Sequence, residues 1–168
     1  LRLGIRGRAL IPMIDPVSAR QLAQAGSGAT VTLELGGRSA PFFNPLTVTG
    51  VVRAASSGVV ELADHAETEI NMGHTLAFDV GPVTLLVTEY AGVAGIHPAV
   101  YRHVGIEPAD FQIIVMKTAS NFQYMTPLTS TMIRVATPGP TQSDIAALAW
   151  QRIPRPCFPM ESLTTWRG

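Results

Sequence analysis

The chain has 168 residues, 46% of them hydrophobic, and its 12 basic and 12 acidic residues leave no net charge. This size and apolar content are enough for one domain with a core, and the lack of any basic run argues against a nucleic-acid or anionic-membrane surface. The single cysteine, Cys157, excludes an internal disulfide, and no apolar run approaches the roughly 18 residues that cross a bilayer.

The first elements are predicted to be a strand, a helix and a second strand. Residues Ala9–Ile14 are apolar and fit a strand. A helix over Pro16–Ala25 follows, because Asp15 can cap its free N–H groups and a proline is tolerated in the first turn. Gly26 can supply the left-handed cap at its end, and Thr30–Leu35 then alternates as a half-buried strand.

Between about residues 46 and 89, apolar residues recur at every second position in several short runs. The runs are residues 48–53, 59–62, 75–80 and 83–88. Two pairs of turn-forming residues, Ser57-Gly58 and Gly81-Pro82, separate neighbouring runs. This pattern predicts an antiparallel β meander in the middle of the chain.

Beyond the meander, short helical segments alternate with apolar runs. We expect helices over residues 98–104, 120–125 and 143–150, strands over residues 111–116 and 132–135, and an extended end over residues 153–159. Gly105 closes the first helix, and Pro127 stops the second. Thr141 and Asp144 are spaced as a capping box for the third.

Together these elements predict an α/β fold with α+β character. We expect a mixed sheet with βα units at both ends, the antiparallel meander in the middle, and a single domain over residues 1–168. Leu1 stands where a start Met is expected, and the segment that it opens resembles the tail of a helix. The chain is therefore expected to be a fragment of a larger protein.

The candidate binding site follows the two late strands. Lys117, the chain's only lysine, comes directly after the run 111–116, and the carboxyl end of a strand is where open α/β sheets collect ligands. The predicted substrate-binding residues are Lys117, Thr118, Ser120, Asn121, Thr137 and Gly139. An ammonium group beside hydroxyls suits an anion, and the turn at residues 137–140 leads into a helix N-terminus. The alternatives are a lysine extending into solvent and an ordinary tight turn.

No metal site or catalytic residue is expected in this chain. The run at residues 64–69 offers carboxylates and an imidazole, but loops of this composition are usually only solvated. His74, His97 and His103 belong to different elements, and His97 is better explained as a helix start. Cys157 has no histidine in its own segment, so a thiolate nucleophile is not expected.

The order of several short motifs resembles the C-terminal domain of the MlrC family. The motifs are Ile96-His97-Pro98, Gly105-Ile106-Glu107-Pro108, the run from Ile114 to Phe122, Pro127-Leu128 and Thr137-Pro138-Gly139. Further matches lie upstream in Asp15-Pro16, Ala25-Gly26, Leu35-Gly36-Gly37, Thr49-Gly50-Val51-Val52 and Met72-Gly73. The resemblance therefore spans most of the chain.

The resemblance implies a metallopeptidase-like parent protein, since the family is named for an enzyme that cleaves linearised microcystin peptides. It also implies that the zinc ligands, a set of His and Asp residues, belong to a preceding N-terminal domain. The chain departs from the family pattern at Asn121 and Gln123, where relatives have His and Arg, and at Ala136, where relatives have Asp. Roles that need those side chains do not carry over to this chain.

Three functions are consistent with these observations. We favour a C-terminal, substrate-cleft-shaping domain of an MlrC-like zinc metallopeptidase that hydrolyses peptide or amide bonds in the cytoplasm. The alternatives are a non-catalytic anion-binding or assembly module, and a self-sufficient enzyme that uses Lys117. The expected partners are the N-terminal domain, a small peptide or amide substrate, and a second copy of the chain. Apolar residues near the end support such an interface: Phe158, Met160, Leu163 and Trp166.

Overall fold

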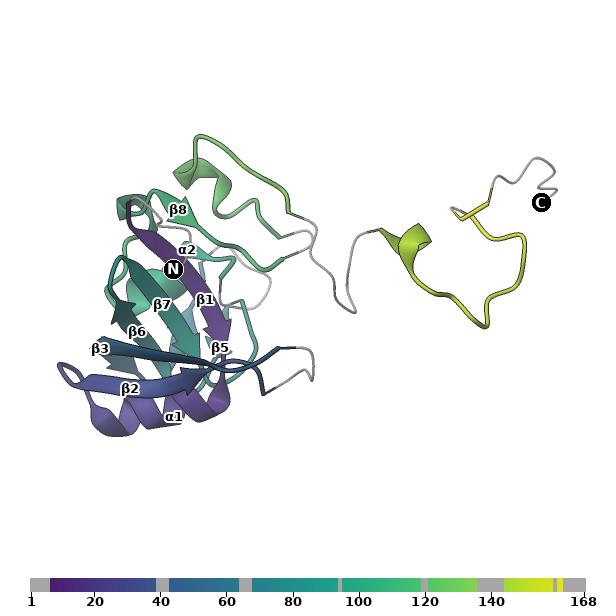
Figure 1. Ribbon diagram of the computed structural model, residues 1–168. Helices are drawn as coiled ribbons and strands as arrows, with labels where there is room; N and C mark the ends of the chain where they lie inside the picture. The colour runs from purple at the N-terminus through teal and green to yellow at the C-terminus, as the bar shows by residue number, and fades with distance from the viewer. Residues whose placement is uncertain are drawn as a thin grey trace. The chain divides into compact units, whose positions relative to one another are not determined.

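The computed structural model of the chain describes residues 7–38, 43–63, 68–93, 95–118, 121–135, 144–158 and 160–161. It divides into two compact units, Leu1–Ser130 and Thr131–Gly168 (Figure 1). None of the helices in those described ranges is long and apolar enough to cross a membrane.

The first unit opens with the predicted strand, helix and strand. These are β1 (Ala9–Ile14), α1 (Pro16–Ala25) and β2 (Thr30–Leu35), with the expected boundaries. The Asp15 carboxylate accepts a hydrogen bond from the Ser18 N–H at 3.1 Å, which satisfies one of the free donors of the first turn. Gly26 ends α1 at a φ of 81°, a conformation that its missing side chain permits.

The meander is present, but the run predicted at residues 59–62 is not part of it. It consists of β3 (Leu46–Ser56), β6 (Thr75–Val80) and β7 (Val83–Thr88), while β4 (Val59–Glu61) and β5 (Glu69–Asn71) form a separate two-stranded sheet. The first half of β3 pairs with β2 and its second half with β6. At the junction, a Cβ on Gly50 would collide with the carbonyl oxygen of Asp79, so this close approach requires a glycine.

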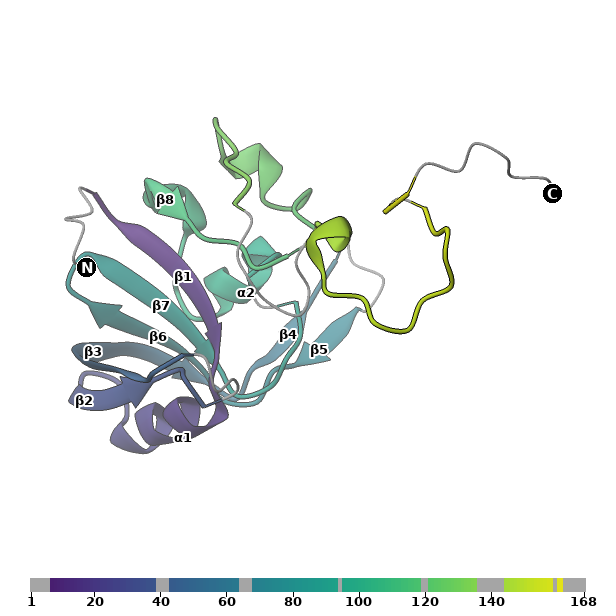
Figure 2. The same cartoon turned by 45° about the vertical axis from the view of Figure 1, so that its right-hand side comes forward.

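The main sheet has six strands in the order β2-β3-β6-β7-β1-β8, where β8 is Ile113–Ile114. Strand β1 pairs in parallel with both β7 and β8, and the other neighbours are antiparallel. The predicted mixed sheet is therefore confirmed (Figures 1 and 2).

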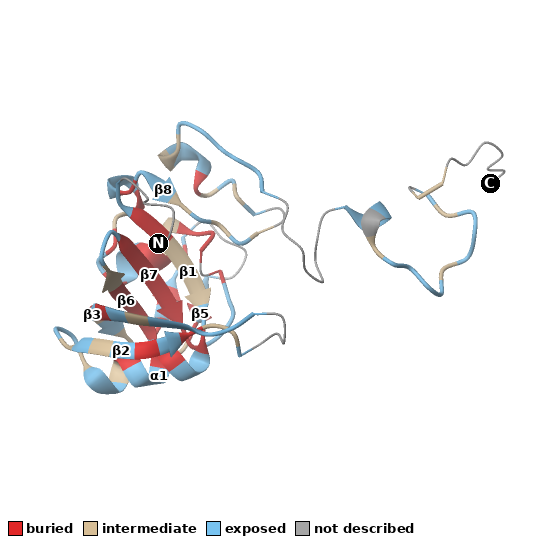
Figure 3. Ribbon diagram, viewed as in Figure 1, coloured by how far each residue is buried: buried red, intermediate tan, exposed pale blue. Residues whose placement is uncertain are grey.

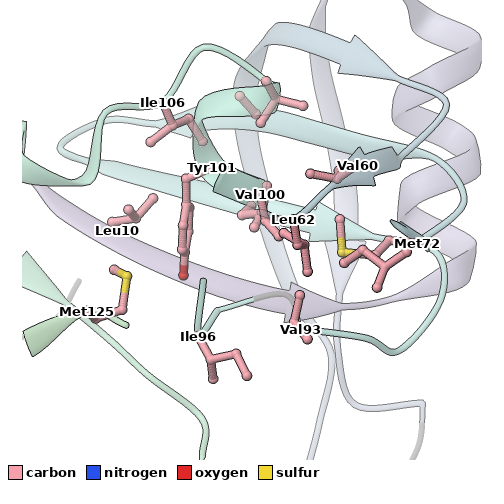
Figure 4. Packing of buried hydrophobic residues seen from close by; sticks show 14 of the residues in the cluster. Leu10, Val60, Leu62, Met72, Val93, Ile96, Val100, Tyr101, Ile106 and Met125 are labelled. Atoms are coloured by element: carbon pink, nitrogen blue, oxygen red, sulfur yellow. The ribbon is translucent and has the colours of Figure 1, made fainter. Parts of the chain in front are cut away.

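Two hydrophobic cores lie on opposite faces of this sheet. Successive side chains of a strand point to opposite faces, so Leu10 and Leu86 belong to one core, and Ala9 and Leu85 to the other. Leu22 of α1 completes the second core. Helix α2 (Pro98–His103) covers the first core, which also holds Val60, Leu62, Met72, Val93, Ile96, Val100, Tyr101, Ile106 and Met125 (Figure 4). Figure 3 shows the resulting buried strip along β6 and β7.

The strand expected over residues 111–116 is present only in part, and it lies at the edge of the sheet. Only β8 forms there, and it is an edge strand whose side chains alternate, so that Ile113 and Val115 are each 42% exposed. The Arg8 N–H donates to the Gln112 side chain at 2.6 Å, and the Arg8 guanidinium lies 4.4 Å from the Phe111 ring centroid. These contacts hold the start of the run at the sheet edge, while Phe111, Ile114 and Met116 pack against the first core on one side only.

The helix expected over residues 120–125 is also wrong. A 3₁₀ turn, Thr126–Leu128, forms instead, with Pro127 inside it. A proline in a first helical turn removes no bond, so it can begin such a turn as readily as it can stop a helix. Another 3₁₀ turn, Pro108–Asp110, links α2 to β8.

The second unit contains little regular structure in its described residues. Residues 132–135 form no regular secondary structure, and all four are exposed. The helix expected over residues 143–150 is reduced to the 3₁₀ turn Ile145–Ala147, capped by a hydrogen bond from the Ala146 N–H to Asp144 at 3.1 Å. The βα unit predicted at this end is therefore not found in the part of the chain that the structure describes.

Candidate functional site

The carboxyl ends of β1 and β7 form the most distinctive edge of the sheet. The chain leaves β1 into α1 on one face, whereas it leaves β7 toward α2 on the opposite face (Figures 1 and 2). Adjacent parallel strands whose connections part in this way define a topological switch point, where open α/β sheets bind ligands. The first residues beyond the two strands are Asp15 and Glu89, and the Asp15 N–H donates to Thr88 at 3.0 Å.

Asp15 is 3% exposed and is held by several donors at once. The Ser18 hydroxyl donates to it at 2.8 Å, the Gly36 N–H at 2.9 Å and the Arg38 guanidinium at 2.8 Å. Burial alone would raise the pKa of Asp15, but the hydrogen bonds from Gly36 and Ser18, together with the Arg38 charge, hold the pKa below its ordinary value. Asp15 is therefore an anion at neutral pH, and it joins β1, α1 and the end of β2.

Glu89 is the second buried carboxylate of this edge, with 8% of the residue exposed. Its Oε1 accepts from Arg20 Nη1 at 2.7 Å, and its Oε2 accepts from the His74 N–H at 3.2 Å. The His74 imidazole Nε2 lies 4.0 Å from the same Oε2. The hydrogen bond from Arg20, followed by that from His74, holds the pKa of Glu89 below its ordinary value.

The two arginines of this edge differ in how many of their N–H donors already have partners. Arg38 uses Nη1 on Asp15 and Ser18 and Nη2 on the Glu34 carbonyl. Arg20 donates only through Nη1, to Glu89, and its side chain is 50% exposed. An open hollow of about 360 Å³ lies between α1 and β2, lined by Gln21, Val31, Thr32, Leu33, Glu34 and Arg38. The hollow shares Arg38 with the Asp15 network but does not reach Glu89. We therefore take the two arginine-bound carboxylates, Asp15 and Glu89, as the centre of the site.

The residues predicted from the sequence are only partly described. Lys117 is exposed and follows the short strand β8, and Thr118 is half-buried. The Thr118 hydroxyl accepts from the Asn121 N–H at 3.0 Å, so these two residues do lie together. Ser120, Thr137 and Gly139 lie outside the described residues.

The histidines do not converge. His97 caps α2, with its Nδ1 accepting from the Ala99 N–H at 3.2 Å, and its ring lies 4.8 Å from that of Tyr124. His103 hydrogen-bonds to the Ser56 hydroxyl, and the run at residues 64–67 lies outside the described residues. Within the ranges that the structure describes, no three His, Cys, Asp or Glu side chains gather where they could hold a metal ion.

The network around Asp15 and Glu89 was missed because its members are far apart in the sequence. Asp15 was recognised only as a helix cap, and Glu89 only as the end of a meander. A usable signal did exist, since each acidic residue directly follows an apolar strand. Joining them required knowing that β1 and β7 are parallel neighbours, which no local pattern gives.

Comparison with known proteins assigns this mixed α/β domain to a family. The sequence profile of the family described as MlrC C-terminus matches residues 1–152. The chain therefore belongs to the MlrC C-terminus family, as its motifs predicted.

One similar solved structure is a crystal structure named "putative metallopeptidase" from Mesorhizobium sp. BNC1, with a TM-score of 0.76 and 26% sequence identity. The alignment covers 95% of this chain and 32% of that one, so this chain spans about a third of the length of that structure. A search of curated protein sequences found no match.

Proposed function

We propose that this chain is the C-terminal, substrate-cleft-shaping domain of a larger zinc metallopeptidase that hydrolyses peptide or amide bonds. The observation that carries the proposal is the family match over residues 1–152, together with the similarity to one third of a protein named "putative metallopeptidase". The remaining two thirds of such a parent would hold the zinc and the catalytic base in an N-terminal domain. The single cysteine of the chain supports a location in the reducing cytoplasm.

The described residues of this chain do not themselves fit a metal site. The two buried carboxylates, Asp15 and Glu89, are each committed to an arginine. A metal ion would have to replace those arginines, because the metal and the guanidinium groups would bind the same carboxylate oxygens. In this proposal the chain takes no part in the chemical step, and its role is to bind and orient the substrate.

Two regions could contact substrate in this arrangement. The first is the predicted set of Lys117, Thr118, Ser120, Asn121, Thr137 and Gly139, in which an ammonium group and hydroxyls would bind an anionic group. The second is the edge formed by Arg20, His74 and Glu89. A charge-assisted hydrogen bond to substrate is worth roughly twice a neutral one, so either region could set orientation.

The proposal is tested on the gene and on its full-length product. We expect the reading frame to continue upstream of Leu1 into a domain with a His and Asp constellation. The full-length protein should bind one zinc per chain and cleave peptides, whereas the 168-residue chain should do neither after dialysis. Tightly held zinc on the 168-residue chain, or a full-length protein without metal or hydrolysis, would contradict the proposal.

The second candidate is a non-catalytic anion-binding or assembly module without peptidase activity. The observation that favours it is the exposure of large apolar side chains in the second unit, where Ile133 is 81%, Val135 75% and Phe158 73% exposed. Apolar surface of this kind marks an interaction site. An inactive full-length protein that still assembles through this unit would select this candidate.

A further inference from the structure

The switch point between β1 and β7 holds one guanidinium that is fixed on one side and open on the other. Glu89 is buried to about nine-tenths and fixes Arg20 through a 2.7 Å hydrogen bond to Nη1. The other N–H groups of Arg20 have no partner among the described residues, and half of the side chain faces solvent. An arginine held in this way is pre-organised to bind a further planar anion, because its remaining donors keep a fixed orientation.

A comparison within the chain shows that this geometry is not that of an ordinary surface ion pair. Arg102 and Glu107 also lie 2.7 Å apart, and the Arg102 side chain is 51% exposed, which matches Arg20. Glu107, however, is 41% exposed, whereas the Glu89 side chain is 10% exposed. The Arg102 pair is solvated on both sides, and such pairs are loosely held. Of these two carboxylates, only Glu89 is a buried anchor.

A second donor and an apolar wall lie beside Arg20. The His74 imidazole is 48% exposed, and its backbone N–H is tied to Glu89. Gly73, at a φ of 61°, lies so close to the Tyr90 ring that an added Cβ would come within 2.9 Å of it. Tyr90 is 52% exposed, so its ring, which lies beside Gly73, is accessible to a ligand.

The helix side of this edge is apolar as well. Val17, three residues before Arg20 on α1, is 38% exposed. Residues three apart on a helix share one face, so Val17 lies beside Arg20. A carboxylate bound by Arg20 would thus have apolar surface within reach.

We propose that this edge binds the carboxylate of a peptide ligand, with Arg20 and His74 as donors, Glu89 as the positioning residue, and Tyr90 and Val17 contacting an adjacent apolar side chain. The inference rests on the proposed function only for the identity of the ligand as a peptide. Pairing between an arginine fork and a carboxylate is planar and can be bidentate, which favours a carboxylate over a neutral amide.

The test is a titration of the ¹⁵N-labelled 168-residue chain followed by NMR. The probes are N-acetylphenylalanine, its α-amide, and the α-amide of N-acetylglutamic acid, which separate a C-terminal carboxylate, no carboxylate and a side-chain carboxylate. We expect the amide signals of Arg20, Gly73, His74 and Tyr90 to shift with N-acetylphenylalanine and not with its α-amide. Shifts with the glutamate derivative alone would assign the carboxylate to an acidic side chain and keep the site.

Variants decide whether the binding belongs to this edge. Arg20→Gln should weaken binding of the carboxylate probe on the order of tenfold, and the matched variant Arg102→Gln should leave it unchanged. His74→Ala gives a second reading if Arg20→Gln proves unstable. Equal binding of acid and amide, equal losses in the Arg20 and Arg102 variants, or no shift at millimolar probe would overturn the inference.

This binding test uses no catalysis, so it fails independently of the proposed function. If the chain binds a carboxylate here but the full-length protein has no hydrolase activity, the site is kept and its role in binding a substrate is excluded. An active full-length protein whose chain binds no carboxylate here would remove the site alone.

Discussion

At the scale of single residues, the buried polar side-chain atoms of the described residues have hydrogen-bond partners, with one exception. Asp15 and Glu89 each have several donors, whereas the Tyr101 hydroxyl is buried without a hydrogen-bond partner among the described residues. Figure 4 shows its oxygen pointing between Met125 and Ile96. Burial raises the pKa of Tyr101 well above its ordinary value, so the group stays neutral. The aromatic ring, and not the hydroxyl, accounts for its place in the core.

Replacing Tyr101 by phenylalanine should therefore stabilise the protein. Removing an unsatisfied buried hydroxyl recovers its desolvation cost, which is about 1 kcal/mol or more. We expect the free energy of unfolding in urea to rise by about that amount. Tyr90→Phe, at a residue that is 52% exposed, serves as the control and should change stability little. A loss of stability in Tyr101→Phe would reveal a hidden partner for the hydroxyl.

Asp15→Asn should destabilise the chain in a pH-dependent way. The substitution keeps a capping oxygen but loses the charge that faces Arg38, at a cost of about 1–3 kcal/mol near neutral pH. Because the folded-state pKa of Asp15 is lowered, its contribution is complete above the unfolded pKa of about 4 and disappears as the pH falls through the folded pKa.

Urea unfolding of both proteins between about pH 7 and pH 2 measures the effect of Asp15→Asn. The difference between them should shrink on the acid side. Asp110→Asn, at an exposed carboxylate, provides the control. A difference that is constant with pH would show that the charge of Asp15 is not what stabilises this corner.

Lys117→Ala tests the site that the sequence predicted. If Lys117 contacts an anionic group of the substrate, the full-length protein should lose roughly tenfold in kcat/KM, the worth of a charge-assisted hydrogen bond. Steady-state kinetics on a peptide substrate would measure this, with Arg102→Ala as an exposed-cation control. Unchanged kinetics would make Lys117 an ordinary solvent-facing residue.

At the scale of elements, the local signals of α1 and the alternation of the meander predicted the structure, whereas the helices expected at residues 120–125 and 143–150 and the pairing of the late apolar runs were not predicted correctly. Helix α1 begins and ends where Asp15 and Gly26 predict, because a cap acts on the backbone next to it. Residues 111–116 and 132–135 look alike as apolar runs, yet one forms an edge strand and the other no strand in the described structure. A strand needs a neighbour, and the neighbour is distant in sequence. For the same reason, the sequence did not predict that Asp15 and Glu89 lie at the ends of neighbouring strands.

Strand β3 depends on one glycine for its two-sided pairing. An added Cβ at Gly50 would collide with the Asp79 carbonyl and approach the Phe78 ring to 2.8 Å, and backbone cannot move aside as a side chain can. Gly50→Val should cost about 1–3 kcal/mol of unfolding free energy, the usual effect of overpacking. Thermal unfolding would measure it. Gly81→Asn, in an open turn at a φ of 57°, should be tolerated, since asparagine accepts that conformation.

At the scale of the whole molecule, the two units differ in how they satisfy their apolar residues. The first buries two clusters on the two faces of one sheet. In the second, none of the described residues is buried (Figure 3). Met132, Ile133, Val135, Ile145, Trp150 and Phe158 are all exposed there. Local bonds, such as that from the Trp150 indole to the Ile145 carbonyl at 2.6 Å, give shape to short stretches but bury little surface.

The purified chain should therefore self-associate through the second unit. Contiguous apolar surface is rarely left in water, and covering it releases about 25 cal/mol for each Å² buried. We expect light scattering at micromolar concentration to give a mass above 17.9 kDa, and a dye for apolar surface to bind. Ile133→Ser with Phe158→Ser should shift the mass toward that of a monomer, whereas Val59→Ser, at a residue 40% exposed in the first unit, should not. A wild-type chain that stays monomeric on concentration and binds no dye would mean that these side chains do not form an interface.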